Sequence, residues 1–342
     1  MATSLVGYRS FFNSTVYTLI EKMEKMEADP VFSLGREEAH TAGTGDTVNW
    51  TSEVLSTYLP IVQPGGDIAE EPVTEGNQLA RTYFSIKGNM AVQYESYLHN
   101  KLDLMLDKAE DLAEGAMNTA SLCLCGQLLT NADATTQTIG SVVQTISCAD
   151  TLAPGSAAHT VPGRAGATFT TIVTSNPALS DTAVDTAMQI LIANNVDQAG
   201  VNKPVGGDFV LVVAENSTMI KKAQQLTGSS LSPETANNAV NVYSGGKMDF
   251  VVLKHGARNA AGQYETTNTN QYHWLLSTKK SLKRNLRYRW AAKPSIPNQG
   301  LFPKYMEKNL DSRIYMFARL VYGLPYWAGM AWSFSTTRPT TS

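Results

Sequence analysis

The sequence predicts an α+β fold organised around one unusually long helix. A helical repeat without proline runs over residues 97–129, and short runs of β-branched and aromatic residues occur on both sides of it. With 342 residues, of which 43% are hydrophobic, the chain can build a large core, as two domains or as one domain with long excursions. No linker divides it into independent halves.

The first 36 residues have the pattern of an arm rather than of a domain. Apolar residues fall at helical spacing over 16–26, and Pro30 ends that pattern. We therefore expect one short amphipathic helix ahead of the first strands. The chain begins with MATS, as a translated N-terminus does, so we expect no proteolytic maturation.

An acidic stretch, PGGDIAEEPVTEG at 64–76, lies between two strand-like runs at 48–62 and 78–95. Between Glu37 and Ala80 there are eight carboxylates and no lysine or arginine. A stretch this long without a core of its own is either a solvated hairpin or an arm shaped by a surface that it touches. The residues alone leave both interpretations open.

The long helical repeat has one apolar and one acidic side. If most of it is helical, it is about 40 Å long at 1.5 Å per residue. The acidic side is either a solvated helix face or a face that receives basic groups. The apolar stripe contains Leu102, Met105, Ala109, Leu112, Ala116 and Cys123, and the acidic face contains Asp103, Asp107, Glu110, Asp111 and Glu114.

The second half of the chain alternates helices and strands. A helix is expected over 179–195 with Ser180 as its N-cap, and a buried strand, Phe209–Val213, leads into a short helix that ends at Gly228. Further strand candidates lie within 138–146, 167–174, 248–256 and 272–280, and the apolar run 311–334 is expected to form a final strand pair.

A basic strip follows at 279–304, with eight lysines and arginines and no carboxylate. Its aromatic residues alternate with arginines, which is compatible with stacking on single-stranded nucleic acid. The alternative, which we favour, is that Leu286, Tyr288 and Trp290 share one strand face and belong to the core. The basic residues are Lys279, Lys280, Lys283, Arg284, Arg287, Arg289, Lys293 and Lys304.

No catalytic or metal-binding motif is present. The five histidines show no metal-ligand spacing, and we find no P-loop, dinucleotide fingerprint or nucleophile elbow. Three cysteines, with Cys123 and Cys125 in a C-x-C pair and Cys148 apart, do not form a disulfide framework. We therefore expect no cofactor and no enzymatic activity, and we interpret the cysteines as small apolar residues in a reducing cytoplasm.

Charge and hydropathy argue against two classes of partner. The formal net charge of −3 does not suit a protein that binds nucleic acid through one broad basic field. Arg9 and Asn13 interrupt the apolar N-terminus, so we expect no signal peptide. The apolar run 320–334 is too short, and too broken by Pro325, to span a bilayer.

The order of these elements resembles the major capsid proteins of tailed bacteriophages, which have the Hong Kong 97 fold. Residues 83–98 are similar to the strand that returns from the E-loop of that family into its spine helix. Residues 206–226 are similar to the strand and helix of its A-domain. Residues 311–334 are similar to its C-terminal P-domain strands, with Gly323 and Pro325 at the turn.

The resemblance implies a division of the chain into five segments. These are an N-terminal arm (1–36), an extended E-loop hairpin (37–86), a P-domain with the spine helix (87–205), an A-domain (206–308) and a return to the P-domain with a C-terminal tail (309–342).

The resemblance also implies a function. The chain is expected to be a major capsid (head) protein that assembles with itself, as pentamers and hexamers, into an icosahedral shell around double-stranded DNA. Expected partners are scaffolding and portal proteins, a decoration protein, and packaged DNA bound without sequence specificity, with no membrane. The expected location is the virion capsid, assembled in the host bacterial cytoplasm. Two alternatives stay open: an encapsulin-like nanocompartment shell and, less favoured, a soluble α+β enzyme.

By the same resemblance the acidic stretch is the E-loop, which lies over an adjacent subunit. We expect its carboxylates to face residues 279–293 of the basic strip of that subunit. Some members crosslink an E-loop lysine to a neighbouring asparagine, but the loop here has no lysine, and Lys87 lies only at its base, so we expect no crosslink. The predicted inter-subunit contacts join Asp67, Glu70, Glu71 and Glu75 to Lys283, Arg284, Arg287 and Arg289.

Overall fold

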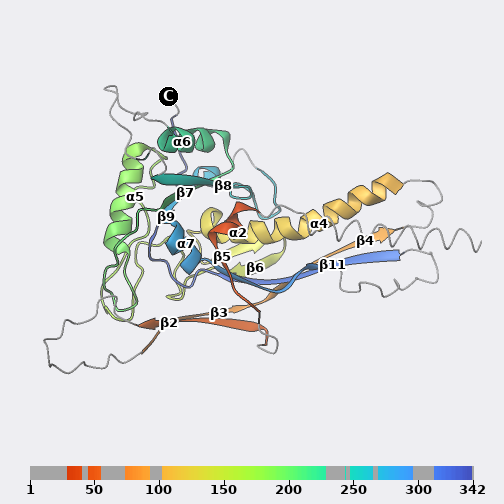
Figure 1. Cartoon of the computed structure of the whole chain (residues 1–342), viewed down its shortest axis with the longest axis horizontal. Helices are drawn as coiled ribbons and strands as arrows, with labels where there is room; N and C mark the ends of the chain where they lie inside the picture. The colour runs from red at the N-terminus through yellow and green to blue at the C-terminus, as the bar shows by residue number, and fades with distance from the viewer. Residues whose placement is uncertain are drawn as a thin grey trace, which may run out of the picture.

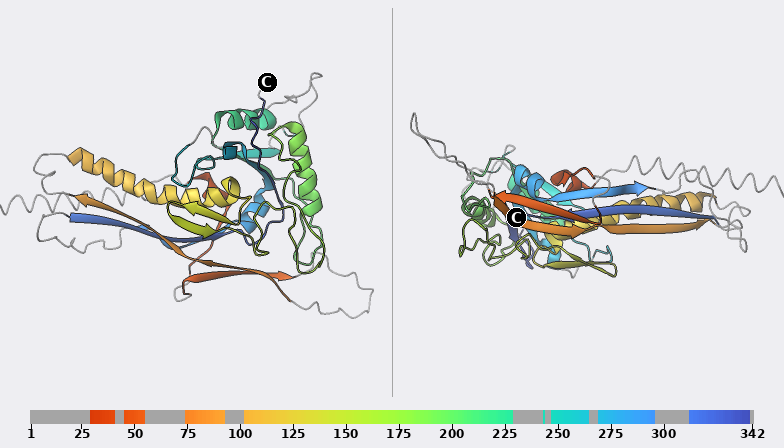
Figure 2. Two further views of the ribbon diagram at one scale, coloured as in Figure 1. Left: turned by 180° about the vertical axis from the view of Figure 1, so that it is seen from behind. Right: turned by 90° about the horizontal axis from the view of Figure 1, so that it is seen from below.

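The computed structural model describes most of the chain beyond residue 28. The described residues are 29–40, 45–54, 74–92, 102–228, 243, 247–264, 269–295 and 312–340. The helix expected over 16–26 and the acidic stretch from 64 to 73 lie outside them. Figure 1 shows a lobe of helices and short strands from which a long helix and two long strands extend, and Figure 2 shows that the molecule is flat when seen from below.

The long helix is present as α4 (Leu102–Cys125), and it continues into a π-helical turn, η1 (Gly126–Thr130). Where its side chains are described, the apolar stripe faces the protein, because Ala116 and Cys123 are buried and Leu112 is half-buried. The prediction of one long helix is therefore confirmed for the described residues. Figure 1 shows α4 lying along two strands, β4 and β11, and its C-terminal end entering the lobe.

The first sheet supports α4 and has the strand order β1-β10-β11-β4. Strand β11 is the long central strand and pairs antiparallel with both β10 and β4, while the short β1 runs parallel to β10. The bounds are β1 (Arg36–Glu37), β4 (Phe84–Val92), β10 (Arg287–Ser295) and β11 (Ser312–Gly323).

The second sheet lies in the lobe and has the order β12-β9-β7-β8. Strands β7 and β8 are parallel, and β9 pairs antiparallel with β7 and with β12. Helices α5 and α6 pack on this sheet. The bounds are α5 (Asp181–Asn194), β7 (Phe209–Ala214), α6 (Ser217–Gly228), β8 (Met248–Leu253), β9 (Trp274–Thr278) and β12 (Met330–Ser333).

Alternating residues of β7 divide the core in two. Val210 and Val212 belong to a cluster that also contains the end of α4 and residues of the first sheet, so this cluster joins the two sheets. Leu211 and Val213 point to the other face and pack with α5 and α6. All four side chains are fully buried, as a strand covered on both faces requires.

Several predicted elements are confirmed close to their expected bounds. Ser180 is the N-cap of α5, because its hydroxyl accepts a hydrogen bond from the Ala183 amide at 3.1 Å. The strand from Phe209 runs into a helix that ends at Gly228, and strands occupy parts of 248–256 and 272–280.

Two hairpins complete the fold. Strands β2 (Thr47–Val54) and β3 (Thr74–Thr82) pair antiparallel, as expected for the two sides of the excursion. Strands β5 (Thr136–Ile139) and β6 (Val142–Thr145) form the second hairpin. A turn at 140–141 therefore divides the strand expected within 138–146.

Two local expectations were wrong. Residues 167–174 form only isolated bridges, through Phe169 and Ile172, because side-chain and loop contacts take up their backbone groups. The strand expected over 272–280 ends at Thr278, because Thr278 caps a short helix, α7 (Lys279–Asn285), through the Ser281 amide.

A short helix that the sequence reading did not identify, α2 (Pro30–Leu34), begins at Pro30. The missing N–H of proline costs nothing at the first helical position, and Asp29 is the N-cap.

The expected C-terminal strand pair was also wrong. Strand β11 belongs to the first sheet and β12 to the second, so the two do not pair with each other. The chain leaves β11 at Gly323, passes through the buried residues 324–329, and enters the other sheet. Two strands also cross between the expected segments. Strand β10 lies in the segment expected to be the A-domain (206–308) but pairs with β11 in the first sheet. Strand β12 lies in the segment expected to return to the P-domain (309–342) but pairs with β9 in the second sheet.

Candidate interaction surface: the base of the arm and the basic strip

The β2–β3 hairpin, which we call the arm, is anchored on the first sheet by Trp50. This side chain is only 3% exposed and packs with Val48, Leu79 and Val321. Gly323, at the end of β11, makes the contact possible. A Cβ atom there would lie 2.7 Å from Cζ3 of Trp50 and 2.9 Å from Cδ2 of Leu79, both too close for a side chain. The described part of the arm is therefore attached to its own subunit.

Glu38, the residue after β1, connects strands β2 and β10 at the base of the arm. Its carboxylate accepts a hydrogen bond from Trp50 Nε1 at 2.7 Å and one from Arg289 Nη2 at 3.0 Å, and it lies 3.5 Å from Arg287 Nη1. The Glu38 side chain is only 14% exposed, so these charge-assisted contacts are shielded from solvent. Burial lowers the pKa of Arg287, and the Glu38 carboxylate partly offsets that effect.

Further polar contacts hold the arm where it meets the sheet. Arg319 Nη2 lies 2.6 Å from Asp46 Oδ1, and its guanidinium lies 5.4 Å from the centroid of the Tyr83 ring. The Tyr83 hydroxyl is 3.0 Å from His40 Nδ1. Arg81 donates hydrogen bonds to the backbone carbonyl and the hydroxyl of Ser147. The base of the arm is thus fixed by polar contacts as well as by Trp50.

Within the described residues, some members of the basic strip have an acidic partner and others have none. Lys279 pairs with Asp249, Lys293 Nζ lies 2.9 Å from Glu37 Oε1, and Arg287 and Arg289 contact Glu38. The remaining described members are exposed on α7: Lys280, Lys283 and Arg284. The interpretation of Leu286, Tyr288 and Trp290 as core residues is confirmed, because all three are buried.

The structure describes some of the residues that were predicted to make inter-subunit contacts. Lys283 and Arg284 are exposed, whereas Arg287 and Arg289 have a partner, Glu38, in their own chain. Glu75 lies in β3, opposite Glu53 of β2. Asp67, Glu70 and Glu71 lie outside the described residues. A contact between subunits therefore stays a prediction.

Sequence reasoning missed one cation beside α7. Lys203 is half-buried, and its pKa is lowered by burial and by the nearby positive charges of Arg284 and Lys280, with Asp197 partly opposing this. Lys203 and α7 are separated by more than 70 residues in the sequence, so no local pattern could have revealed their proximity.

Most of the described acidic side of α4 faces solvent, and Glu110 is half-buried. Asp107, Asp111 and Glu114 are exposed, and Lys108 is exposed beside them, while the side chain of Asp103 is outside the described set. The helix face is thus of mixed charge rather than purely acidic.

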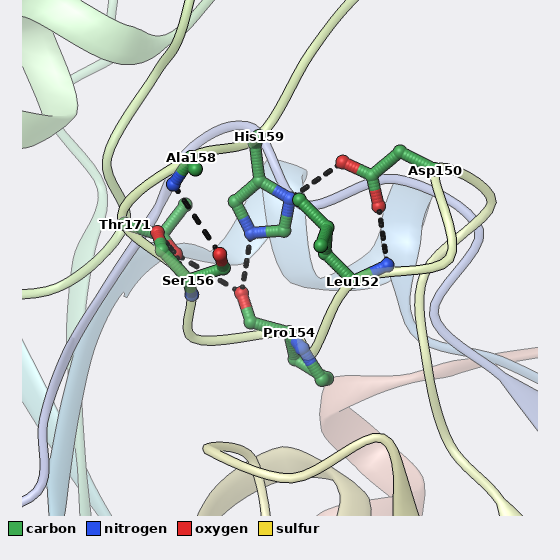
Figure 3. Close-up of polar contacts among 7 residues, drawn as sticks. All are labelled: Asp150, Leu152, Pro154, Ser156, Ala158, His159 and Thr171. Atoms are coloured by element: carbon green, nitrogen blue, oxygen red, sulfur yellow. Dashed lines mark hydrogen bonds and ion pairs between the residues drawn. The ribbon is translucent and has the colours of Figure 1, made fainter.

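A buried histidine and aspartate form the pair that most resembles catalytic machinery (Figure 3). His159 Nδ1 lies 2.7 Å from Asp150 Oδ2, and Nε2 lies 3.0 Å from the carbonyl oxygen of Pro154. The imidazole is 0% exposed and stacks on Trp327 at a centroid distance of 4.6 Å. With both ring nitrogens bonded and no solvent access, this pair holds loops together and cannot reach a substrate.

The three cysteine thiols are buried and unreactive. Burial raises the pKa of the Cys123 thiol to about 12 and also raises those of Cys125 and Cys148, so all three are protonated at neutral pH. Within the described ranges, no group of histidine, cysteine, aspartate and glutamate side chains is arranged to hold a metal ion. The described helices include none with the length and apolar content that crossing a bilayer requires.

Comparison with known proteins identifies the fold. No protein-family model and no curated protein sequence matches the chain. Among solved structures, the capsid of cyanophage P-SCSP1u aligns with 90% of this chain and 88% of its own, with a TM-score of 0.51 and 12% identity. The capsid of an empty GTA particle aligns with 90% and 89%, with a TM-score of 0.51 and 7% identity. The chain therefore has the Hong Kong 97-like phage capsid fold, as the sequence resemblance implied.

Proposed function

We propose that this chain is a structural shell subunit, the major capsid protein of a tailed phage, which assembles with itself into an icosahedral shell around double-stranded DNA. The observation that carries the proposal is an alignment with a capsid structure that covers 90% of this chain. The proposed role is structural rather than enzymatic.

The anchored arm supports assembly through contacts between copies. Glu38 and Trp50 fix its base, so the direction in which the hairpin leaves the subunit is set by the folded body. A fixed projection that reaches a different surface of the next copy makes a heterologous contact, and heterologous contacts close into rings when the rotation allows it. Pentamers and hexamers are the rings proposed here, and scaffolding, portal and decoration proteins are the proposed further partners.

The test is assembly of the purified full-length chain. Mass photometry is expected to show rings or megadalton particles, and electron microscopy is expected to show closed shells. If the chain stays monomeric when it is co-expressed with the neighbouring genes of its own genome, the proposal is wrong.

The particle contents decide between two kinds of shell. Nuclease-protected double-stranded DNA in particles isolated from their native source supports the phage capsid. Particles that contain a single cargo protein and no nucleic acid would instead support the encapsulin-like alternative.

A further inference from the structure

A polar cavity of about 360 Å³ lies between the π-helical turn η1, strand β5 and the loop 258–260, which follows β8. Figure 1 shows β5 and β6 beside the C-terminal end of α4, where this cavity is found. Its volume is within the range of about 300–1,000 Å³ that small-ligand sites have. The described residues that line it supply side-chain amides, hydroxyls and one cation, Arg258, and no carboxylate. Such a lining suits a ligand with hydrogen-bonding groups and a negative charge.

Strand β5 borders the cavity with an open edge. Gly140 has a φ of 58° and takes the first of the two loop positions, as in a type II′ turn, so Ile139 and Val142 form a hydrogen-bonded pair. Bonded and unbonded pairs alternate in an antiparallel ladder, so the backbone N–H and C=O groups of Thr136 and Thr138 point away from β6. Both residues line the cavity, and among the described strands β5 pairs with β6 alone. These backbone groups are available to an added strand.

A buried glutamine holds β5 in place. Gln137 is only 3% exposed, and its Nε2 atom donates a hydrogen bond to the Cys123 carbonyl at 3.0 Å. A Cβ atom on Gly126 would collide with Gln137 Oε1, so the glycine lets this side chain lie against η1. The Ile146 amide donates to the Thr135 carbonyl at 2.8 Å, which continues the alternation of bonded pairs beyond the hairpin. The position of the open edge is therefore set by the folded body.

Hydrogen bonds also join the opposite wall of the cavity to the rest of the site. The Gly140 amide donates to the Ala260 carbonyl at 2.9 Å, and the Thr130 hydroxyl donates to the Gly256 carbonyl at 2.7 Å. The first bond ties the hairpin turn to the loop, and the second ties η1 to the residues just before it. A ligand that enters the cavity thus finds its shape already formed, which lowers the free-energy cost of binding.

Arg258 keeps hydrogen-bond donors for a ligand. Its Nη2 atom lies 3.3 Å from Glu215 Oε2, and its Nε atom is shielded from solvent without a hydrogen-bond partner among the described residues. A guanidinium has five N–H donors, arranged as a fork that fits a carboxylate. The Tyr264 ring, with its centroid 5.9 Å from the guanidinium carbon, supports the side chain from another direction. Arg258 can therefore bind a second carboxylate while it keeps its contact with Glu215.

We propose that this cavity binds the carboxylate-bearing end of an extended peptide from a separate protein. The peptide adds to the open edge of β5 as a further strand, bonded to the backbone of Thr136 and Thr138, and its carboxylate meets Arg258. The backbone bonds give affinity, and the lone cation in a lining without carboxylates selects the charge of the ligand. All walls of the cavity come from one chain, so the site is complete without a second copy. The proposal goes beyond the proposed shell function, which assigns no ligand to this surface.

The first experiment measures peptide binding to the unassembled full-length chain. The probes are a panel of fluorescently labelled pentapeptides of valine and threonine, each with a free C-terminal carboxylate, and fluorescence anisotropy is the readout. We expect saturable binding that weakens about tenfold when the carboxylate is amidated, because the charge-assisted bonds are lost. Methylation of the peptide's backbone nitrogens should also weaken binding, because such a peptide cannot add as a strand. If no member of the panel binds, the proposal is overturned.

Matched substitutions then test the charge. Arg258→Gln should weaken peptide binding about tenfold, since a hydrogen-bonded charge is lost. Lys254→Gln removes the same charge from an exposed residue nearby that does not line the cavity, and it should bind as before. Equal weakening by both variants would show a nonspecific charge effect and overturn the proposal.

A second pair of substitutions tests the edge. Thr138→Pro removes an outward N–H of β5 without breaking a bond to β6, and it should weaken binding about fivefold. Val143→Pro makes the same change at the facing position of β6, on the edge away from the cavity, and should bind as before. Melting temperatures show which variants are folded, and the methylated peptides give the same test if a proline variant is not. Equal weakening by the two proline variants would overturn the strand addition.

The last comparison identifies the source of the peptide. Assembled particles should bind the same probes as the unassembled chain does, because a site for a separate protein stays open in the shell. Loss of binding on assembly would mean that a second copy covers the cavity, and a separate protein as the source would be wrong. Peptide binding is measured without a shell, so its failure leaves the proposed function intact, and failure to form particles leaves the peptide result intact.

Discussion

The indole of Trp50 occupies the space where a side chain on residue 323 would lie. A Cβ atom built on Gly323 would be 2.7 Å from Trp50 Cζ3, although the two residues are in different sheets and far apart in the sequence. Trp50 is the apolar anchor of the arm, and Gly323 is the position that admits it. The apolar part of the arm's anchoring therefore depends on a glycine at the end of β11.

We expect Gly323→Ala to displace Trp50 and to weaken the anchoring of the arm. Overpacking of this kind costs about 1–3 kcal/mol, measured as the free energy of unfolding in urea. Limited proteolysis should also cut the chain within the arm sooner than in the wild type. Gly115→Ala is the matched control, because a Cβ there meets nothing within 4 Å and alanine favours the helix. Equal stability of Gly323→Ala and the wild type would contradict this account.

We expect Glu38→Gln to destabilise the base of the arm by about 1–3 kcal/mol, because Arg287 and Arg289 lose the carboxylate that they share in a shielded site. The glutamine keeps the size of the side chain, so the loss reports charge rather than packing. Chemical denaturation provides the measurement. The control, Glu37→Gln, removes an exposed pair with Lys293 and should cost about 0–1 kcal/mol. Similar losses of stability for both substitutions would mean that the shielded contacts of Glu38 contribute no more than the exposed pair of Glu37 with Lys293.

Local patterns in the sequence predicted the three longest described helices, α4, α5 and α6. The uninterrupted periodicity of α4, the cap at Ser180 and the apolar run that starts at Phe209 each depend on residues close together in the chain. Helix formation and capping are local, so their signals survive in a single sequence.

Pairings between distant residues could not be predicted in this way. Strand β12 pairs with β9 rather than β11, and Glu38 meets Arg289, which is 251 residues away. The charges of the excursion and of the basic strip were visible in the sequence, but which acid meets which base depends on the folded arrangement. For the same reason, the sequence did not reveal that Lys203 lies near Arg284 and Lys280 of α7.

We expect His159→Asn to destabilise the fold by about 3–5 kcal/mol, because it leaves the Asp150 carboxylate buried without its partner and removes the ring that stacks on Trp327. Thermal unfolding followed by circular dichroism gives the size of the effect. In a double-mutant cycle with Asp150→Asn, the costs should not add, since either substitution alone breaks the same contact. Additive costs would show that the two side chains act independently.

We expect alkaline pH to destabilise the fold in a way that depends on Cys123. Burial raises the pKa of its thiol from 9.0 to about 12, so the unfolded chain releases this proton first as pH rises. The stability that comes from keeping the thiol neutral is complete below pH 9.0 and is lost progressively up to about pH 12. This one group lowers the free energy of unfolding by at most about 1.4 kcal/mol per pH unit. Urea denaturation at pH 8 and at higher pH measures the slope, which should be shallower in Cys123→Ala, and an unchanged slope would contradict the assignment.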